Sequence, residues 1–374
     1  MVKVLAYALG AAAAIAAFGF KWLPGEMRDF EVYWTAASRA LDAQPLYRSA
    51  DGHYQFKYLP AFAVLTAPVA LVPLVQAKAA WFVACVVLLV ALIALSLRLL
   101  PERRRKSWLI VLVVVIAMSK FYGHELVLGQ VNILFAVLAS AGVLMTVRRE
   151  ETAAELLFIA AAAVKPYGII FLPWMAYVRG RRAILTTVVG LVLLLALPAV
   201  LYGARGTIEL HRQWWRTVTE STAPNLTNND NVSVAGMYAK WLGAGQTSSR
   251  AAAATSLALI AAVAFVVARR RTVHRPESLE GALLLTCIPL ISPQGWDYVF
   301  LITTPAIALF ANYDDFLPGW LRWTTWAAIA TIGLSLFDVM GRERYAAFMS
   351  LSVITVCYLI LVAALVALRA RRIT

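Results

Sequence analysis

Long apolar runs separated by short polar segments recur along most of this chain. Six runs approach the ~20 residues that a helix needs to cross the hydrocarbon core of a bilayer. They cover residues 4–20, 79–97, 183–201, 251–268, 320–337 and 346–368. The pattern predicts an all-α polytopic membrane protein.

Three pairs of shorter apolar runs flank polar residues. The pairs are 108–118 with 133–145, 156–164 with 169–178, and 283–291 with 299–310. Each run is shorter than an ideal span, which favours helices that end early at a buried polar site. The alternative is tilted helices joined by ordinary loops.

Composition agrees with a membrane protein. The 374 residues are 61% hydrophobic and 14% charged, whereas soluble domains are about half apolar and about a quarter charged. The three cysteines, Cys85, Cys287 and Cys357, lie inside apolar runs. We therefore expect them to pack in the interior and to form neither a disulfide framework nor a metal site.

The basic residues are distributed as short blocks between the apolar runs. These blocks account for much of the net charge of +14 and occupy residues 103–106, 148–149, 179–182, 269–271 and 369–372. Short positive loops mark the cytoplasmic side of a membrane protein. The charge therefore indicates orientation, and we expect no nucleic-acid partner.

Threading the chain by this rule gives a single membrane domain, 1–374, with about 12 transmembrane helices and both termini in the cytoplasm. Residues 1–20 are interpreted as a retained first helix, and 21–58 as the first outer loop. Pro60, Pro68 and Pro73 argue against a straight span, so 59–75 is expected to be an interfacial or re-entrant segment. A long outer loop, 204–249, carries tryptophans typical of interfacial helices.

Most of the remaining polar motifs fall on the predicted outer face. The chain has no P-loop, no G-x-G-x-x-G after a strand, no HExxH motif and no CxxC pair. No cytoplasmic segment is long enough to fold into a nucleotide-binding domain. We therefore expect chemistry at the outer leaflet that uses neither ATP nor a nucleotide-sugar.

Six motifs on this face resemble those of a known family. In chain order they are DFEVY followed by AASRALDAQPLY, FKYLPAFAVLTAPVALVP, GQVN, AAAVKPYGIIFLP, NVSVAG and SPQGWD. Together they resemble glycosyltransferase family 87, the polyprenyl-phosphate-mannose-dependent mannosyltransferases of the C-type glycosyltransferase fold. The chain departs from the family pattern at Leu59, which replaces a proline, and at Tyr298 and Val299, which replace a histidine pair.

The resemblance implies an inverting transfer of a sugar, mannose in the family, from a polyprenyl-phosphate donor. The acceptor would be a lipid or glycan hydroxyl at the outer face of the bacterial cytoplasmic membrane. Asp29 is the expected general base, because the family has an aspartate in its first outer loop, and Glu31 is the alternative. A purely structural role for Asp29 would be to cap the helix that follows or to pair with Arg28.

The departing lipid phosphate requires cations or amide donors. Lys165 is the leading candidate because it precedes Pro166 in an apolar stretch. Further candidates are His124, Lys120, Arg28 and Lys57. Expected sugar or acceptor contacts are Tyr33, Gln130, Asn132, Asn231, Ser233, Trp296 and Asp297, although Asp297 could instead orient a cation and polar residues at helix ends often satisfy only backbone groups.

The sequence predicts no metal ion and no cofactor, because no acidic or histidine set has metal-ligand spacing. The expected partners are the lipid-linked sugar donor, a glycolipid or glycan acceptor and membrane lipids. A secondary transporter or lipid flippase is the main alternative, since broken helices with central charges are also found there. Within enzymes, the alternative is another C-type transferase, such as an aminoarabinose transferase or a glycan ligase.

Overall fold

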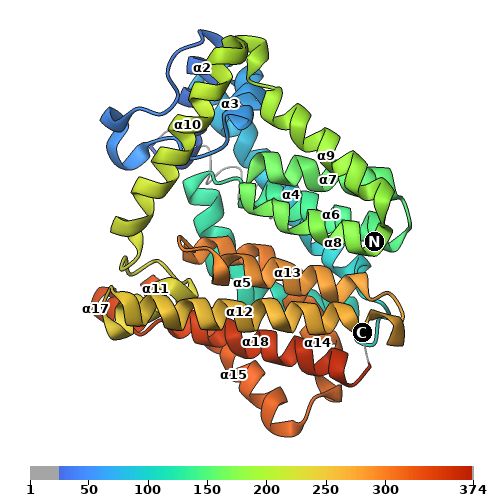
Figure 1. Ribbon diagram of the computed structural model, residues 1–374. Coiled ribbons are helices and arrows are strands. Elements are labelled where there is room, and N and C mark those ends of the chain that lie inside the picture. Colours follow the sequence, from blue (N-terminus) through green and yellow to red (C-terminus); the bar gives the residue numbers. More distant parts are fainter. Residues whose placement is uncertain (1–24, 373–374) are drawn as a thin grey trace, which may run out of the picture.

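The computed structural model describes residues 25–372, and within that range the chain is helical throughout (Figure 1). The only extended pairing in this range is an isolated antiparallel bridge between Asn231 and Trp296. The apolar run at 4–20, expected to be the first helix, lies outside the described residues. The all-helical prediction is confirmed for the part described.

Within residues 25–372, four helices are long and apolar enough to cross a membrane: α4 (Leu74–Arg98), α5 (Ser107–Leu128), α12 (Gln246–Ala268) and α18 (Val353–Ala370). A fifth candidate is the pair α9 (Arg181–Ala196) and α10 (Ala199–Asn225), which is bent by 92°. Pro198 lies at this break. The figure of about 12 spans is not confirmed by the residues described, and it stays a prediction.

The segments expected at the outer interface form short helices. They are α2 (Arg28–Leu41), η1 (Ser49–Tyr54), α3 (Pro60–Thr66) and η2 (Ala67–Leu71). Pro60 opens α3, where its missing N–H has no helical partner to lose. Residues 59–75 therefore do not form one straight span. The long segment 204–249 is also mostly helical, in α10, α11 (Val234–Leu242) and the start of α12.

Two predicted helix boundaries are wrong. We expected the helix over 108–118 to end at the polar stretch that follows, but α5 continues to Leu128. Its polar residues Lys120 and Glu125 are buried inside the protein, where they meet polar groups, so the helix does not need to end before them. The run 346–368 is instead divided between α17 (Arg342–Ser350) and α18, with Ser352 left-handed at the break.

The predicted break near residue 165 is confirmed. Helix α7 (Glu151–Val164) ends there, and η3 (Pro166–Ile170) leads into α8 (Phe171–Arg179). A residue before proline is disfavoured in the α region, and Lys165 is accordingly extended, with φ −139° and ψ 119°. The remaining helices are α6 (Asn132–Val147), η4 (Arg270–Thr272), α13 (Glu277–Ile291), η5 (Asp297–Thr303), α14 (Thr304–Tyr313), η6 (Asp314–Phe316), α15 (Gly319–Leu334) and α16 (Phe337–Met340).

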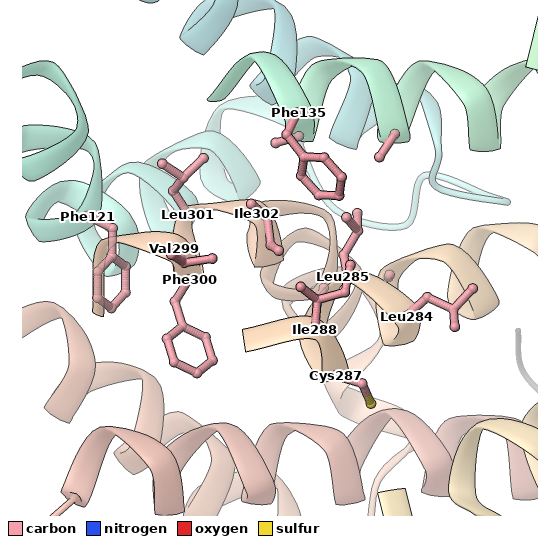
Figure 2. Close-up of a cluster of buried hydrophobic side chains, with 14 of the residues drawn as sticks. Phe121, Phe135, Leu284, Leu285, Cys287, Ile288, Val299, Phe300, Leu301 and Ile302 are labelled. Atoms are coloured by element: carbon pink, nitrogen blue, oxygen red, sulfur yellow. The ribbon is translucent and has the colours of Figure 1, made fainter. Parts of the chain in front are cut away.

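A hydrophobic core joins α5 and α6 to α13 and η5 (Figure 2). Phe300 stacks on Tyr358 with ring centroids 3.8 Å apart, and Phe121 packs against both rings. Phe135 and Leu285 are fully buried or nearly so in the same cluster. This packing fixes η5, and therefore Asp297, against the second half of α5.

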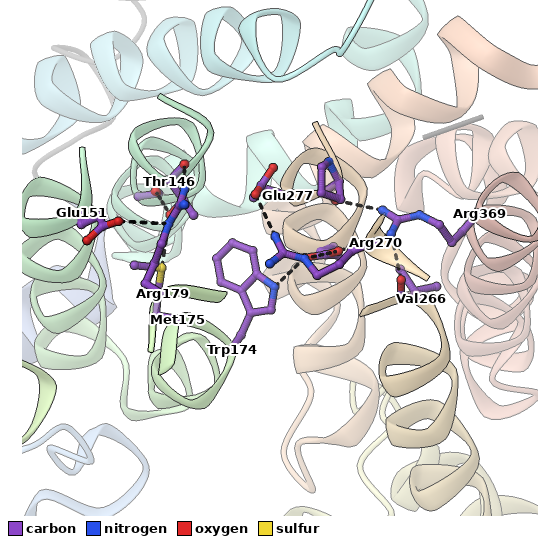
Figure 3. Close-up of polar contacts among 12 residues, drawn as sticks. Thr146, Glu151, Trp174, Met175, Arg179, Val266, Arg270, Glu277 and Arg369 are labelled. Atoms are coloured by element: carbon purple, nitrogen blue, oxygen red, sulfur yellow. Dashed lines mark hydrogen bonds and ion pairs between the residues drawn. The ribbon is translucent and has the colours of Figure 1, made fainter. Parts of the chain in front are cut away.

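The basic blocks gather at one end of the bundle. Arg104 and Arg105 pair with Asp315 and Asp314, and Arg104, His274 and Arg372 line one crevice of about 300 Å³. At the same end, Arg270 and Arg369 bind acidic residues of α13 (Figure 3). Helix α5 begins here and runs for 22 residues, about 33 Å, so its polar second half lies at the opposite end.

Candidate active site

Asp29 lies in the first turn of α2, against the end of α5. The N-cap residue is Met27, in a left-handed conformation without a side-chain cap. The amide of Met27 donates to the Val127 carbonyl at 2.9 Å, which docks the start of α2 on α5. Arg28 pairs with Glu31 at 3.2 Å. Asp29 therefore neither caps the helix nor pairs with Arg28, and neither of the structural roles considered for it is present.

A hydrogen bond connects Asp29 to the turn after α5. Gln130 Nε2 donates to Asp29 Oδ2 at 2.5 Å. The turn depends on Gly129, which has φ 68° and lies so close to α2 that a Cβ would be 2.8 Å from the Met27 side chain. Only glycine combines this backbone conformation with this close approach. The GQVN motif thus brings an amide to the carboxylate.

The orientation of the Gln130 amide is fixed by two tyrosines. The hydroxyls of Tyr33 and Tyr58 lie 2.9 and 3.2 Å from Gln130 Oε1 and 2.6 Å from each other, so the two protons are shared among these three oxygens. Because the carbonyl oxygen accepts from this hydroxyl pair, the NH₂ group faces Asp29. Tyr33, expected to contact sugar, is buried and supports this amide.

Burial raises the pKa of the Asp29 carboxyl above its ordinary value of 3.8. The Gln130 hydrogen bond and the charges of Lys165, His53 and Lys57 act in the opposite direction. Within residues 25–372, no cation lies in ion-pair distance of Asp29. Asp29 is therefore a partly buried carboxylate of increased basicity, held by one neutral donor.

Lys165 lies in the same network. Its Nζ donates to the Tyr58 hydroxyl at 2.7 Å, and Tyr58 in turn contacts Gln130. Lys57 is half-buried nearby, and burial lowers its pKa while the Asp29 charge opposes that change. Two of the five cations proposed for the donor phosphate, Lys165 and Lys57, thus lie on the Asp29 side of the site.

Glu125 was missed by the sequence analysis. It is fully buried in α5 and accepts from Asn132 Nδ2 at 3.0 Å and from the Ile133 amide at 2.7 Å. It therefore caps the start of α6 and holds the turn that carries Gln130. Asn132 is also fully buried and accepts the Tyr167 hydroxyl. A carboxylate inside an apolar span was the signal that could have identified Glu125.

A second charged cluster adjoins the first. Asp297 lies 3.1 Å from Lys120 Nζ and 3.5 Å from His124 Nδ1. The Tyr345 hydroxyl reaches the same carboxylate at 3.5 Å. The next residue, Tyr298, lies 3.4 Å from Gln130 Nε2 and so connects the two clusters. Asp297 thus orients cations, one of the two roles considered for it.

The side chains of Asn231 and Ser233 form hydrogen bonds with backbone groups. Asn231 Nδ2 donates to the Pro293 carbonyl, its Oδ1 accepts from the Ser233 amide, and the Ser233 hydroxyl caps α11. Both side chains are completely buried, which accounts for them without a ligand. Trp296 is partly exposed, and its backbone pairs with Asn231.

Glu31 points away from Asp29. It pairs with the buried Lys78 at 2.6 Å and with Arg28. Together with Arg39 and Asp51, Glu31 and Arg28 line a crevice of about 220 Å³ that does not include Asp29. Arg28 is thereby separated from the other candidate cations.

Residues 25–372 contain no group of three histidine, cysteine or acidic side chains placed to hold a metal ion. The prediction that no metal is needed stays a prediction.

Comparison with models of protein families identifies glycosyltransferase family 87 over residues 56–293, more than half of the chain. The matched region contains the GQVN turn, Lys165 and the Lys120–His124 face of α5, whereas Asp29 and Asp297 lie outside it. No curated protein and no solved structure matches the chain.

Proposed function

Because the chain belongs to glycosyltransferase family 87, we propose that it transfers a sugar from a polyprenyl-phosphate donor to a lipid or glycan hydroxyl. The sugar is mannose, and its anomeric configuration inverts. The family match favours this reaction over transport or lipid flipping. Aminoarabinose transfer and glycan ligation are further C-type reactions, which the product assay below distinguishes.

In this proposal Asp29 is the general base. The acceptor oxygen attacks the anomeric carbon, and its proton moves to the Asp29 carboxylate as the new C–O bond forms. The bond between the anomeric carbon and the phosphate oxygen breaks, and its electrons stay on the phosphate. A general base of this kind contributes about a hundred- to ten-thousandfold in rate.

The observation that carries the proposal is the environment of Asp29. Its carboxylate is held by an amide whose direction is fixed by Tyr33 and Tyr58, and the described residues offer it no ion-pair partner. Burial raises its pKa, which strengthens it as a base. Glu31 lacks these properties because Lys78 and Arg28 neutralise it.

We place the reaction at the outer face of the bacterial cytoplasmic membrane. The support is the separation of charge along α5, with the basic block 103–106 at its start and the Gln130 turn after its end. Basic loops favour the cytoplasmic side. Both chain ends are then expected in the cytoplasm.

The test is a product assay. Purified protein is incubated with polyprenyl-phosphate mannose, with polyprenyl-phosphate aminoarabinose and with a membrane glycolipid extract, and new glycolipids are identified by mass spectrometry. A mannosylated lipid whose anomeric configuration is inverted relative to the donor is expected. Transfer of aminoarabinose alone would assign the alternative C-type reaction, and no transfer from any lipid-linked donor would reject the proposal.

A further inference from the structure

Lys120 and His124 lie one helical turn apart on α5 and so share one face of the helix. Asp297, from η5, lies between them and contacts both. The carboxylate is buried, with only 2% of Asp297 exposed. One acidic group therefore holds two cationic groups at the end of the span where Gln130 meets Asp29.

The histidine of this cluster is oriented by the carboxylate. Asp297 Oδ1 lies 3.5 Å from His124 Nδ1, and the side chain of His124 is 46% exposed. No hydrogen bond among the described residues engages its Nε2. A carboxylate on one ring nitrogen fixes the ring and directs the other nitrogen outward, where it can meet a ligand.

Lys120 is a buried cation whose donors are not all used. Its side chain is 4% exposed, and its Nζ lies 3.1 Å from Asp297 Oδ2 and 4.8 Å from the Tyr345 ring centroid. No acceptor in the described part of the chain meets this Nζ with hydrogen-bond geometry. A buried ammonium with three donors is stabilised by an additional anionic acceptor.

The cluster lies next to the proposed base without containing it. Tyr298, adjacent to Asp297, contacts the same Gln130 amide that holds Asp29. In an inverting substitution, the base and the leaving phosphate lie on opposite sides of the anomeric carbon. Lys165 is hydrogen-bonded to Tyr58 on the Asp29 side, whereas Lys120 and His124 lie beyond Tyr298.

We propose that Lys120 and His124, oriented by Asp297, bind the phosphate group of the lipid-linked donor and stabilise its charge as it departs. This inference rests on the proposed function. The electrons of the broken C–O bond remain on the phosphate, the acceptor proton goes to Asp29, and His124 Nε2–H donates a hydrogen bond without transferring its proton. Lys165 then acts on the Tyr58–Gln130 network and does not contact the phosphate.

The neighbouring charges are compatible with an anionic ligand. Asp297 supplies one negative charge against Lys120, and against His124 when its imidazole is protonated. Asp230 also acts electrostatically on His124, but it is exposed on the loop before Asn231. A phosphodiester brings one negative charge and acceptor oxygens that match the unused donors.

The test measures binding without turnover, in an Asp29→Asn background. The ligand is a short-chain polyprenyl phosphate without sugar, with inorganic phosphate as a second arm that separates headgroup recognition from lipid partition. His124→Asn removes the outward nitrogen, whereas His124→Gln keeps an amide donor near the Nε2 position. His211→Asn is the matched control, because His211 is partly exposed and its one hydrogen bond in the described residues is with a backbone carbonyl, that of Leu195.

We expect His124→Asn to weaken polyprenyl-phosphate binding about ten- to a hundredfold, the range of one charge-assisted hydrogen bond. His124→Gln and Lys165→Met should each lose less than His124→Asn, and the control His211→Asn should bind within twofold of the parent. A loss below threefold in His124→Asn, or a tenfold loss in Lys165→Met, overturns the inference. Lys120→Gln is the second variant in the same binding assay. Thermal unfolding is measured for every variant.

Failure of this inference can be distinguished from failure of the proposed function. If the wild type forms a glycolipid but His124→Asn binds polyprenyl phosphate normally, only the phosphate assignment is rejected. If the wild type transfers no sugar from any lipid-linked donor, the proposed function itself is rejected.

Discussion

The two ends of the helix bundle bury charge in opposite ways. At the basic end, Arg369 and Glu280 are fully buried and lie 3.3 Å apart, and Arg270 and Trp174 also contact Glu280 (Figure 3). At the other end, Asp29 has one neutral hydrogen-bond donor, and His124 is half-exposed. In the first network, called closed, protein groups meet both members of the buried pair Arg369–Glu280, whereas the second network, called open, leaves capacity for a ligand.

This difference separates charged residues that stabilise the fold from charged residues that are available for catalysis. The closed network joins α8, η4, α13 and α18, so removing one member leaves an uncompensated buried charge. In the open network, Asp29 contributes little to the stability of the helix packing. A partly buried carboxylate without a cationic partner is costly to ionise, so its charge does not stabilise the fold. Variants at the closed end should therefore change stability, and variants at the open end should change rate.

The largest expected effect is on the rate of transfer by Asp29→Asn. Asparagine preserves the shape but cannot accept the proton, so transfer per folded molecule should fall about a hundred- to ten-thousandfold. Because burial raises the pKa of Asp29 in the folded state, the ionised carboxylate lowers stability at neutral pH. The variant should thus unfold at the same temperature as the wild type or higher.

Asp42→Asn is the matched control, because Asp42 is exposed at the other end of α2. It should leave the rate unchanged. If Asp29→Asn turns over at the wild-type rate, the open network is not catalytic, and the proposed difference between the two ends of the bundle is wrong.

The next effect is on the stability of Glu280→Gln. The change removes the partner of a fully buried Arg369, and breaking such a pair costs about 3–5 kcal/mol. Thermal or denaturant unfolding in detergent should show this loss, while the transfer rate per folded molecule stays within about threefold. Glu277→Gln should cost less, because Arg270 keeps Glu280 as a second partner. Equal stability of Glu280→Gln and wild type would contradict a structural role for the closed network.

The smallest effect is expected for Glu31→Gln. Glu31 is 27% exposed and pairs with Lys78 and Arg28 outside the open network. Lys78 is buried but keeps the Glu26 carbonyl as an acceptor, so stability should fall by less than in Glu280→Gln, and the transfer rate should stay close to wild type. A transfer rate that collapses in this variant, with Asp29→Asn active, would move the base to Glu31.

The class of fold could be predicted from the apolar pattern, because the length and hydropathy of a membrane helix are local properties of the sequence. The break at Lys165 could also be predicted, since Pro166 acts on its immediate neighbour. The continuation of α5 past Met118 could not. It depends on partners for Lys120 and Glu125 that come from Asp297 and Asn132, and for Lys120 the partner lies far along the chain.

The candidate site was predictable to a similar degree. The motifs singled out Asp29, Gln130 and Lys165, and the structure places these three residues in one network through Tyr58. The roles within it were less accessible, because polar residue types at helix ends do not reveal what they contact. The side chains of Asn231 and Ser233 are hydrogen-bonded to backbone groups. Glu125 was overlooked, although it holds the turn that carries Gln130.

The most direct test of Asp29 as the base is the pH dependence of the single-turnover transfer rate, measured for wild type and for Asp29→Asn. Because burial raises the pKa of Asp29 and the ionised form is active, the wild-type rate should fall as pH drops through an apparent pKa above 3.8. This acid limb should be absent from the residual activity of Asp29→Asn. An acid limb that persists unchanged in the variant, or a wild-type rate independent of pH, would contradict the account.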